Sequence, residues 1–308
     1  MNRGHPPPAD PRVGIPGTGR ALVPPSEDGH VEKPGLVASD VDGTLLDPLE
    51  QLRPRTASAV SRVLDAAIPM VLATGRSPRW VYPVARALRV GGLAVCVNGA
   101  VILDVERRAV LSTHAIDPVL LRDVADVVLD ALPGCALAVE QCVDADPPTQ
   151  PPEDDTRGAP VALVGPGYLS PWGVHQRSPV PLAELLGRPA VRLIVRHRGV
   201  SSREMARTVG PLVSDAVEIT YSTDDGLIDV MRAGVNKASG LSEVADLHGV
   251  DRADVVAFGD MPNDIPMLRW AGHGVAMENA HPEVLAVADE TTTSNAEDGV
   301  ARILERWF

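Results

Sequence analysis

Short, continuous apolar runs alternate along this chain with segments whose apolar residues have helical spacing. The clearest runs are Leu36–Ala38, Met70–Ala73, Leu93–Val97 and Val255–Phe258. A strand that is apolar on both faces is typical of a parallel sheet covered by helices on both sides. We therefore predict an α/β fold in which each run is a buried strand and helices fill the intervals.

Composition narrows the class of protein. At 308 residues the chain suffices for one large domain or two smaller ones. Its formal net charge of −13 argues against nucleic acid or an anionic membrane as a partner. No apolar run approaches the ~20 residues that span a bilayer, and the N-terminus lacks the pattern of a signal segment. The cysteines lack metal-ligand spacing and indicate reduced thiols. We expect a cytoplasmic protein, and the sequence indicates no oligomeric state.

Composition and pattern also divide the chain into parts. Residues 1–33 are rich in Pro, Gly and polar side chains, so we expect a disordered extension there. The parallel-sheet pattern covers 34–115 and resumes over 223–308. The residues between them, 116–222, have the mixed pattern of an α+β insertion, with a loop at 144–160 that is crowded with Pro and acidic residues.

The first apolar run ends in Asp40-Val41-Asp42-Gly43-Thr44-Leu45. Alternate strand residues share a face, so both carboxylates reach one crevice if the strand continues. If the strand ends at Asp40, a turn at Gly43 can bend Asp42 back over the same crevice. One carboxylate can then attack a phosphorus atom while the other transfers the proton. The alternative is an acidic turn in which both carboxylates are solvated.

Polar residues also follow the next two predicted strands. Thr74-Gly75-Arg76 comes after the second run, and Asn98-Gly99-Ala100 after the third. In parallel sheets, ligands bind in the crevice beyond the carboxyl ends of the strands. Three strand ends that deliver polar groups to one edge therefore indicate a binding site there.

Two further motifs follow the insertion. Asn236 is placed as the N-cap of a helix that begins with Lys237, where a cation opposes the helix dipole. Anion binding is one reason for this lysine, and simple solvation is the more common one. After Val255–Phe258, the segment Gly259-Asp260-Met261-Pro262-Asn263-Asp264 can place its first and last carboxylates on one side of a helical turn. The alternative makes Asp260 an N-cap and Asp264 a surface acid.

In this order along the chain, the motifs resemble those of the haloacid dehalogenase (HAD) superfamily. The segment Gly274-Val275-Ala276-Met277-Glu278-Asn279-Ala280-His281-Pro282 resembles the Cof-type, subclass IIB branch of sugar-phosphate phosphatases. The resemblance implies a Rossmann-like parallel-sheet core, 34–115 with 223–308, and an inserted α+β cap domain, 116–222. It also implies phosphatase activity on a small phosphorylated metabolite. Sugar or polyol phosphates are the default substrates, followed by phosphorylated cofactors such as flavin or pyridoxal species.

The resemblance also implies a role for each motif residue. Asp40 would be the nucleophile that forms an aspartyl-phosphate, and Asp42 would act as acid and then as base. Thr74 would hold a phosphoryl oxygen, and Lys237 would neutralise charge on the nucleophile and the phosphoryl group. The residues that would bind the substrate are Gly75, Arg76, Asn98, Asn263 and Asn279.

Mg²⁺ is the cofactor that the resemblance implies. Its ligands would be Asp40, the main-chain carbonyl of Asp42 and Asp260, with Asp264 in support. Oxygen ligands and retained waters suit Mg²⁺, and the sequence contains no cluster of His or Cys that would favour a softer metal.

Two residues depart from the family pattern. Ala238 follows Lys237 where Gly is frequent, and Glu278 precedes Asn279 where relatives usually have Gly, which would put an acid near the phosphate site. Two alternatives to a hydrolase remain open. One is a phosphomutase of the phosphomannomutase type, which returns the phosphoryl group to the sugar, and the other is a non-catalytic sugar-phosphate sensor.

Overall fold

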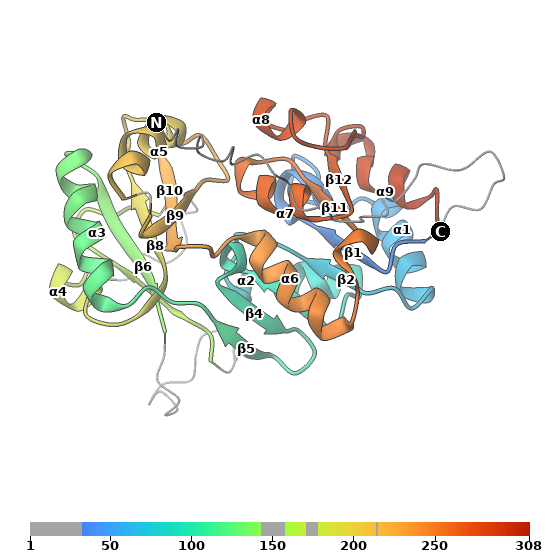
Figure 1. Ribbon diagram of the computed structural model, residues 1–308, viewed down its shortest axis with the longest axis horizontal. Coiled ribbons are helices and arrows are strands. Elements are labelled where there is room, and N and C mark those ends of the chain that lie inside the picture. The colour runs from blue at the N-terminus through green and yellow to red at the C-terminus, as the bar shows by residue number, and fades with distance from the viewer. Residues whose placement is uncertain (1–32, 143–157, 171–177, 214) are drawn as a thin grey trace, which may run out of the picture.

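The computed structural model describes residues 33–142, 158–170, 178–213 and 215–308. The extension expected at 1–33, apart from its last residue, and most of the loop expected at 144–160 lie outside these ranges. A five-stranded sheet in which every neighbouring pair is parallel forms the centre of one half of the molecule (Figure 1). Its strands, in spatial order, are β13 (Glu290–Thr291), β12 (His273–Ala276), β11 (Val255–Gly259), β1 (Leu36–Ser39) and β2 (Met70–Leu72).

Helices cover both faces of this sheet, as its apolar strands require. Alternate strand residues contact opposite layers, so Val37 and Phe258 pack against one set of helices and Ala38 and Ala257 against the other. The first set is α1 (Pro54–Asp65), α2 (Pro78–Leu88) and α9 (Gly299–Leu304), and the second is α6 (Lys237–His248), α7 (Ile265–Trp270) and α8 (Pro282–Leu285). The predicted α/β fold with a parallel sheet is confirmed.

The strand β3 (Leu93–Cys96) keeps the predicted parallel arrangement only at one bridge and otherwise pairs in another sheet. It pairs antiparallel with β4 (Val101–Asp104), which pairs with β5 (Ala109–Thr113) in a separate three-stranded sheet. Its link to the parallel sheet is a bridge between Ala73 and Val95. The short turn after β3 returns the chain beside it at once, and such a connection permits only antiparallel pairing.

A second five-stranded sheet, antiparallel throughout, forms the other half of the molecule (Figure 1). Helices α3 (Pro118–Ala131) and α5 (Ser202–Val213) cover one of its faces, with Leu137, Leu193 and Ile228 in the core between them and the sheet. The strands, in spatial order, are β7 (Val161–Val164), β6 (Ala136–Gln141), β8 (Ala190–Arg196), β10 (Leu227–Arg232) and β9 (Val217–Thr220), and a short helix, α4 (Leu182–Leu185), precedes β8.

The position of β10 concerns the boundary that the sequence predicts between the insertion, 116–222, and the returning parallel-sheet segment, 223–308. This strand lies between β8 and β9 in the second sheet. A boundary between 222 and 223 would therefore separate β10 from both strands to which it is hydrogen-bonded. We propose that the chain returns to the parallel-sheet half after Arg232, because strand pairing decides which half a strand joins and the apolar pattern of the sequence does not specify pairing.

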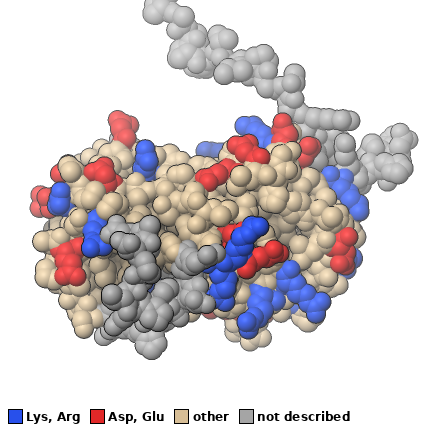
Figure 2. Space-filling view, turned by 90° about the horizontal axis from the view of Figure 1, so that it is seen from below, with Lys and Arg blue, Asp and Glu red and all other residues tan. Residues whose placement is uncertain are grey.

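The described part of the chain contains no helix with the length and apolar character needed to cross a lipid bilayer. On the face of the molecule shown in Figure 2, Lys and Arg side chains are interspersed with Asp and Glu. Charges of both signs are therefore distributed over this face rather than gathered at one end.

Candidate active site

The turn that follows β1 is closed by a hydrogen bond from the N–H of Leu46 to the carbonyl of Val41, at 3.0 Å. Gly43 lies inside this turn with a φ of 77°, a left-handed conformation that glycine adopts without steric cost. A Cβ at this position would overlap the carboxylate of Asp260. Gly43 therefore lets the turn approach the loop after β11, which brings two of the sequence motifs into contact.

Lys237 joins two of the predicted carboxylates. Its Nζ lies 2.6 Å from Oδ1 of Asp40 and 2.6 Å from Oδ1 of Asp264, and its side chain is 0% exposed. The residue begins α6, whose N-cap Asn236 forms a capping box with Ser239. These neighbours satisfy the helix terminus, so the lysine side chain is free to extend between the carboxylates. The interpretation of Lys237 as a solvated surface residue is wrong.

Asp264 has hydrogen-bond partners for both of its carboxylate oxygens. Oδ1 faces Lys237, and Oδ2 accepts from two successive backbone N–H groups, the first of them that of Asp260, at 2.9 Å each. Oδ1 of Asp260 accepts from the hydroxyl of Thr44 at 2.9 Å. Asp40, Asp260 and Asp264 each place one oxygen within 4.8 Å of the others. Asp264 is thus buried at the centre of the loop and is not a surface acid.

Burial and charge set the electrostatics of this group. Burial raises the pKa of Asp40 well above its usual range, and Lys237 opposes that shift. Burial also raises the pKa of Asp260 to about 7, with a further contribution from Asp264. Although burial lowers the pKa of Lys237, the two carboxylates that it contacts raise it above its ordinary value. Three carboxylates around one ammonium leave a buried site that favours an additional cation.

Thr74 and Asn98 are buried side by side at the ends of β2 and β3. The N–H of Asn98 donates to the carbonyl of Thr74 at 3.0 Å, and Nδ2 of Asn263 donates to Oδ1 of Asn98 at 3.0 Å. A Cβ on Gly75 would lie 3.1 Å from that same Oδ1, so Gly75 packs directly on the amide. The N–H of Arg76 donates to the Thr74 hydroxyl at 3.1 Å. The structure therefore brings together three of the predicted strand ends.

Asp42 and Arg76 face each other rather than the buried carboxylates. Nε of Arg76 lies 2.8 Å from Oδ2 of Asp42, and Nη2 lies 2.5 Å from Oδ1. The side chain of Asp42 is 50% exposed. The second aspartate of the first motif thus reaches solvent, while the first is enclosed with Lys237.

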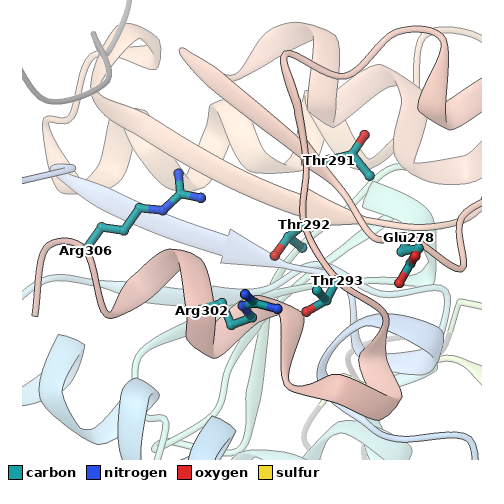
Figure 3. A pocket seen from close by; sticks show the side chains of 6 residues that line it. All are labelled: Glu278, Thr291, Thr292, Thr293, Arg302 and Arg306. Atoms are coloured by element: carbon teal, nitrogen blue, oxygen red, sulfur yellow. The ribbon is translucent and has the colours of Figure 1, made fainter.

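Asn279 supports the turn after β1. Its Nδ2 donates to the carbonyl of Gly43 at 2.9 Å, and its Oδ1 accepts from the N–H of Asn295 at 2.9 Å. The adjacent Glu278, expected near the phosphate site, lines a separate pocket of about 490 Å³. None of the predicted site residues lines this pocket, whose side chains come from the loop after β12 and from the segments around β13 and α9 (Figure 3): Glu278, Thr291, Thr292, Thr293, Arg302 and Arg306.

Sequence reasoning missed several residues that contact the predicted site. Thr44 lies in the first motif, and the motif by itself does not show that its hydroxyl donates to Asp260. Three charged residues of the second sheet, Glu140, Arg192 and Asp229, are buried beside the loops that follow β2 and β3. Arg192 and Asp229 each interrupt an apolar stretch of their strand, and Glu140 ends one. A charged residue in such a position is the signal that could have found them.

The family model for haloacid dehalogenase-like hydrolases matches residues 37–145 and 172–304. The chain belongs to this family. The match spans both halves of the molecule and every motif described above, so the family resemblance that the motifs predicted is confirmed.

Two bacterial phosphatases are similar to the chain over most of its length. One is 5-amino-6-(5-phospho-D-ribitylamino)uracil phosphatase YitU of Bacillus subtilis, at 26% identity over 90% of this chain and 98% of that protein. The other is pyridoxal phosphate phosphatase YbhA of Escherichia coli, at 27% identity over 87% of this chain and 97% of that protein. A solved HAD subclass IIB sugar phosphatase shares the fold, with a TM-score of 0.70 and 22% identity over 88% of this chain and 98% of that one. The chain is a phosphatase of the HAD family.

Proposed function

We propose that this protein is a Mg²⁺-dependent phosphomonoester hydrolase that acts on a small phosphorylated metabolite through an aspartyl-phosphate. The observation that carries the proposal is the buried ammonium of Lys237 between Asp40 and Asp264, with Asp260 beside them. A carboxylate held by a lysine at the end of a parallel strand is suited to attack phosphorus, provided that the negative charge of the phosphate is offset.

The residues present fit Mg²⁺. The available donors are carboxylate oxygens, which this ion prefers, and the absent side chain of Gly43 leaves the space beside Asp260 free. We assign Asp40, Asp260 and the main-chain carbonyl of Asp42 as ligands, with Asp264 in support. When bound, the ion would neutralise the negative charge that gathers as a phosphate dianion approaches these carboxylates.

The protein's own residues would carry the proton and group transfers. In the first step, a carboxylate oxygen of Asp40 bonds to phosphorus, the bond from phosphorus to the ester oxygen breaks, and Asp42 gives that oxygen a proton. In the second step, Asp42 takes a proton from water as the water attacks phosphorus, which releases inorganic phosphate and restores Asp40. Because Lys237 holds Oδ1 of Asp40, Oδ2 is the oxygen available for attack.

The substrate-binding roles belong to the same proposal. Thr74, Gly75, Asn98 and Asn263 would form the wall that receives the phosphoryl oxygens, since they lie together where β2, β3 and β11 end. Asn279 would contribute by holding the turn at Gly43, and Arg76 would contribute by orienting Asp42. The second sheet with α3 and α5 would form a cap that closes over the substrate and excludes water during the first step.

The similar phosphatases guide the choice of substrate. Their names specify a ribitylamino compound and pyridoxal phosphate, both small phosphorylated metabolites. We propose a sugar or polyol phosphate for this chain, with phosphorylated cofactors next. A cytoplasmic location is part of the proposal, supported by the three cysteines, which are all unpaired as thiols in the structure.

Phosphate release tests this function. The wild type and Asp40→Asn would be assayed on a panel of sugar, polyol, nucleotide and cofactor phosphates, with Mg²⁺ and with EDTA. We expect release that requires Mg²⁺ and is lost in Asp40→Asn, while Asp65→Asn, a change at an exposed acid on α1, leaves it unchanged. Release that persists in Asp40→Asn, or no release from any compound by folded wild-type protein, would contradict the proposal.

A further inference from the structure

Three charged side chains lie together on the face of the second sheet that is opposite α3 and α5. Glu140 of β6 is the direct cross-strand partner of Arg192 of β8, and Nη2 of Arg192 lies 3.1 Å from Oε1 of Glu140. Nη1 of Arg192 lies 3.0 Å from Oδ2 of Asp229 on β10. We call these residues the Glu140–Arg192–Asp229 cluster. All three are more than nine-tenths buried, at 3%, 7% and 3% exposure respectively.

The cluster borders the candidate active site. Arg192 donates to the carbonyl of Gly75 at 3.0 Å, and Nδ2 of Asn98 donates to Oδ2 of Asp229 at 3.0 Å. The hydroxyl of Ser77 also donates to Glu140. The second sheet thus contacts the loops after β2 and β3, where the phosphoryl group is proposed to bind. A substrate whose phosphate lies there would extend its carbon skeleton toward the cluster.

Four polar atoms at this place are buried without a hydrogen-bond partner among the described residues. They are Oε2 of Glu140, Oδ1 of Asp229, Nε of Arg192 and Oδ1 of Asn263. Buried polar atoms are nearly always paired, and one left unpaired is costly. Such a group of orphans therefore points to a ligand that supplies the partners. Because three of the four atoms are acceptors, the ligand must carry several hydrogen-bond donors, and the hydroxyl groups of an alcohol are donors of this kind.

The charge of the cluster disfavours a ligand that carries a second anionic group. Two carboxylates, those of Glu140 and Asp229, outnumber the one guanidinium of Arg192. A second phosphate placed here would meet a net negative environment in a site of low dielectric. Next to the charges, the same face carries an apolar patch of Ala138, Tyr168, Ile194 and Leu227, which can contact the carbon atoms of a ligand.

We infer that the Glu140–Arg192–Asp229 cluster is a leaving-group subsite that binds the hydroxyl groups of a neutral, polyhydroxylated alcohol and rejects a second anionic group. The inference rests on the proposed phosphatase function and names the residues that select its substrate. It also separates this chain from a phosphomutase, since an enzyme that holds a sugar bisphosphate must bind the second phosphate with cations.

Steady-state kinetics of Glu140→Gln and Asp229→Asn test the subsite. The probes are ribitol phosphate, a hydroxyl-rich monophosphate; nitrophenyl phosphate, whose leaving group has no hydroxyl besides the ester oxygen; and a hexose bisphosphate. We expect each variant to lose at least ~10-fold in kcat/KM for ribitol phosphate, since paired hydroxyls discriminate strongly. Nitrophenyl phosphate should change by less than ~3-fold, and the bisphosphate, a poor substrate of the wild type, should improve relative to ribitol phosphate.

The matched control is Asp104→Asn, which changes a buried, ion-paired carboxylate of β4 far along the chain from the cluster and should leave the ratio of the substrates unchanged. An equal loss for all substrates in Glu140→Gln and Asp229→Asn would show that the cluster only holds the two halves together, and would overturn the inference. Unchanged kinetics for ribitol phosphate would overturn it as well. If the proposed function itself were wrong, the wild type would release phosphate from none of the probes.

Discussion

Arg76 holds the carboxylate of Asp42 with two hydrogen bonds, from Nε at 2.8 Å and from Nη2 at 2.5 Å. A guanidinium matches a carboxylate in this two-pronged geometry, which fixes the orientation of the carboxylate as well as its position. The residue proposed as acid and base is therefore oriented by Arg76, while the proposed nucleophile Asp40 is oriented by Lys237. The two aspartates of one motif depend on two different cations.

Replacing Arg76 with lysine should lower kcat by about 10-fold for alkyl phosphates. A lysine keeps the charge but contacts only one carboxylate oxygen at a time, so it holds Asp42 less firmly, and proton transfer to the leaving oxygen suffers. Nitrophenyl phosphate, whose leaving group needs no proton, should be affected much less. The control is Arg55→Lys, since Arg55 donates two hydrogen bonds to Glu305 in the same bidentate geometry at the surface. This variant should leave kcat unchanged. Equal losses for both substrate types would argue against an orienting role.

Gly43 and Gly92 form a matched pair for testing the close approach of the first turn to Asp260. Both have positive φ, 77° and 73°, but a Cβ on Gly92 would meet nothing within 4 Å. Alanine at either position should cost about 1 kcal/mol of unfolding free energy through backbone strain. Gly43→Ala should cost about 2 kcal/mol more and abolish phosphate release, because its Cβ displaces Asp260. Denaturant unfolding and activity that are the same for both variants would contradict this assignment.

Lys237→Met should destabilise the metal-free protein by about 3–5 kcal/mol, the usual cost of removing one partner from a buried ion pair. Methionine fills a similar volume, so the loss would report the uncompensated charges of Asp40 and Asp264 rather than a cavity. Chemical denaturation with EDTA measures the effect. Lys33→Met, at the other lysine of the chain, serves as the control. A change below about 0.5 kcal/mol for Lys237→Met would mean that the lysine does not stabilise these carboxylates.

Mg²⁺ should stabilise the folded protein, by about 3 kcal/mol at a concentration 100-fold above its Kd. Asp260→Asn removes one of three mutually repelling buried carboxylates, so this variant should be at least as stable as the wild type without metal. It should nevertheless lose most of the stabilisation by Mg²⁺. Thermal unfolding with and without the ion measures both effects, and Asp104→Asn should respond as the wild type does. An undiminished response of Asp260→Asn would remove it from the metal site.

The sequence predicts those features of the fold and site that depend on local pattern. Continuous apolar runs identified β1, β2 and β11 of the parallel sheet, and the polar residues after them identified the loops that meet at its edge. The position of Lys237 at a helix start, unfavourable to the helix dipole, made anion binding one of two explanations from the sequence, and the structure decides for it with two carboxylates. Its identity is a further sign, since Lys33 is the only other lysine in the sequence, and a compact ammonium can lie between two carboxylates.

Features that depend on pairing between distant strands could not be predicted in the same way. The apolar residues of β3 and β10 are as compatible with the parallel sheet as with the sheets in which they lie. The contact between Arg192 and the carbonyl of Gly75 joins residues 117 positions apart, and it exists only once the two halves meet. The direction of Asp42 toward Arg76 is likewise a matter of rotamer and turn geometry, which the motif does not encode.

Trapping the phosphoryl group on Asp40 would test the aspartyl-phosphate intermediate directly. The variant Asp42→Asn would be mixed with nitrophenyl phosphate and Mg²⁺, quenched in acid, digested and analysed by mass spectrometry. This substrate needs no acid for the first step, and the variant lacks the base for the second, so the intermediate should accumulate. We expect a nearly stoichiometric phosphoryl group on Asp40 that hydroxylamine removes. Release of nitrophenol with Asp40 unmodified, or with the phosphoryl group on another residue, would contradict it.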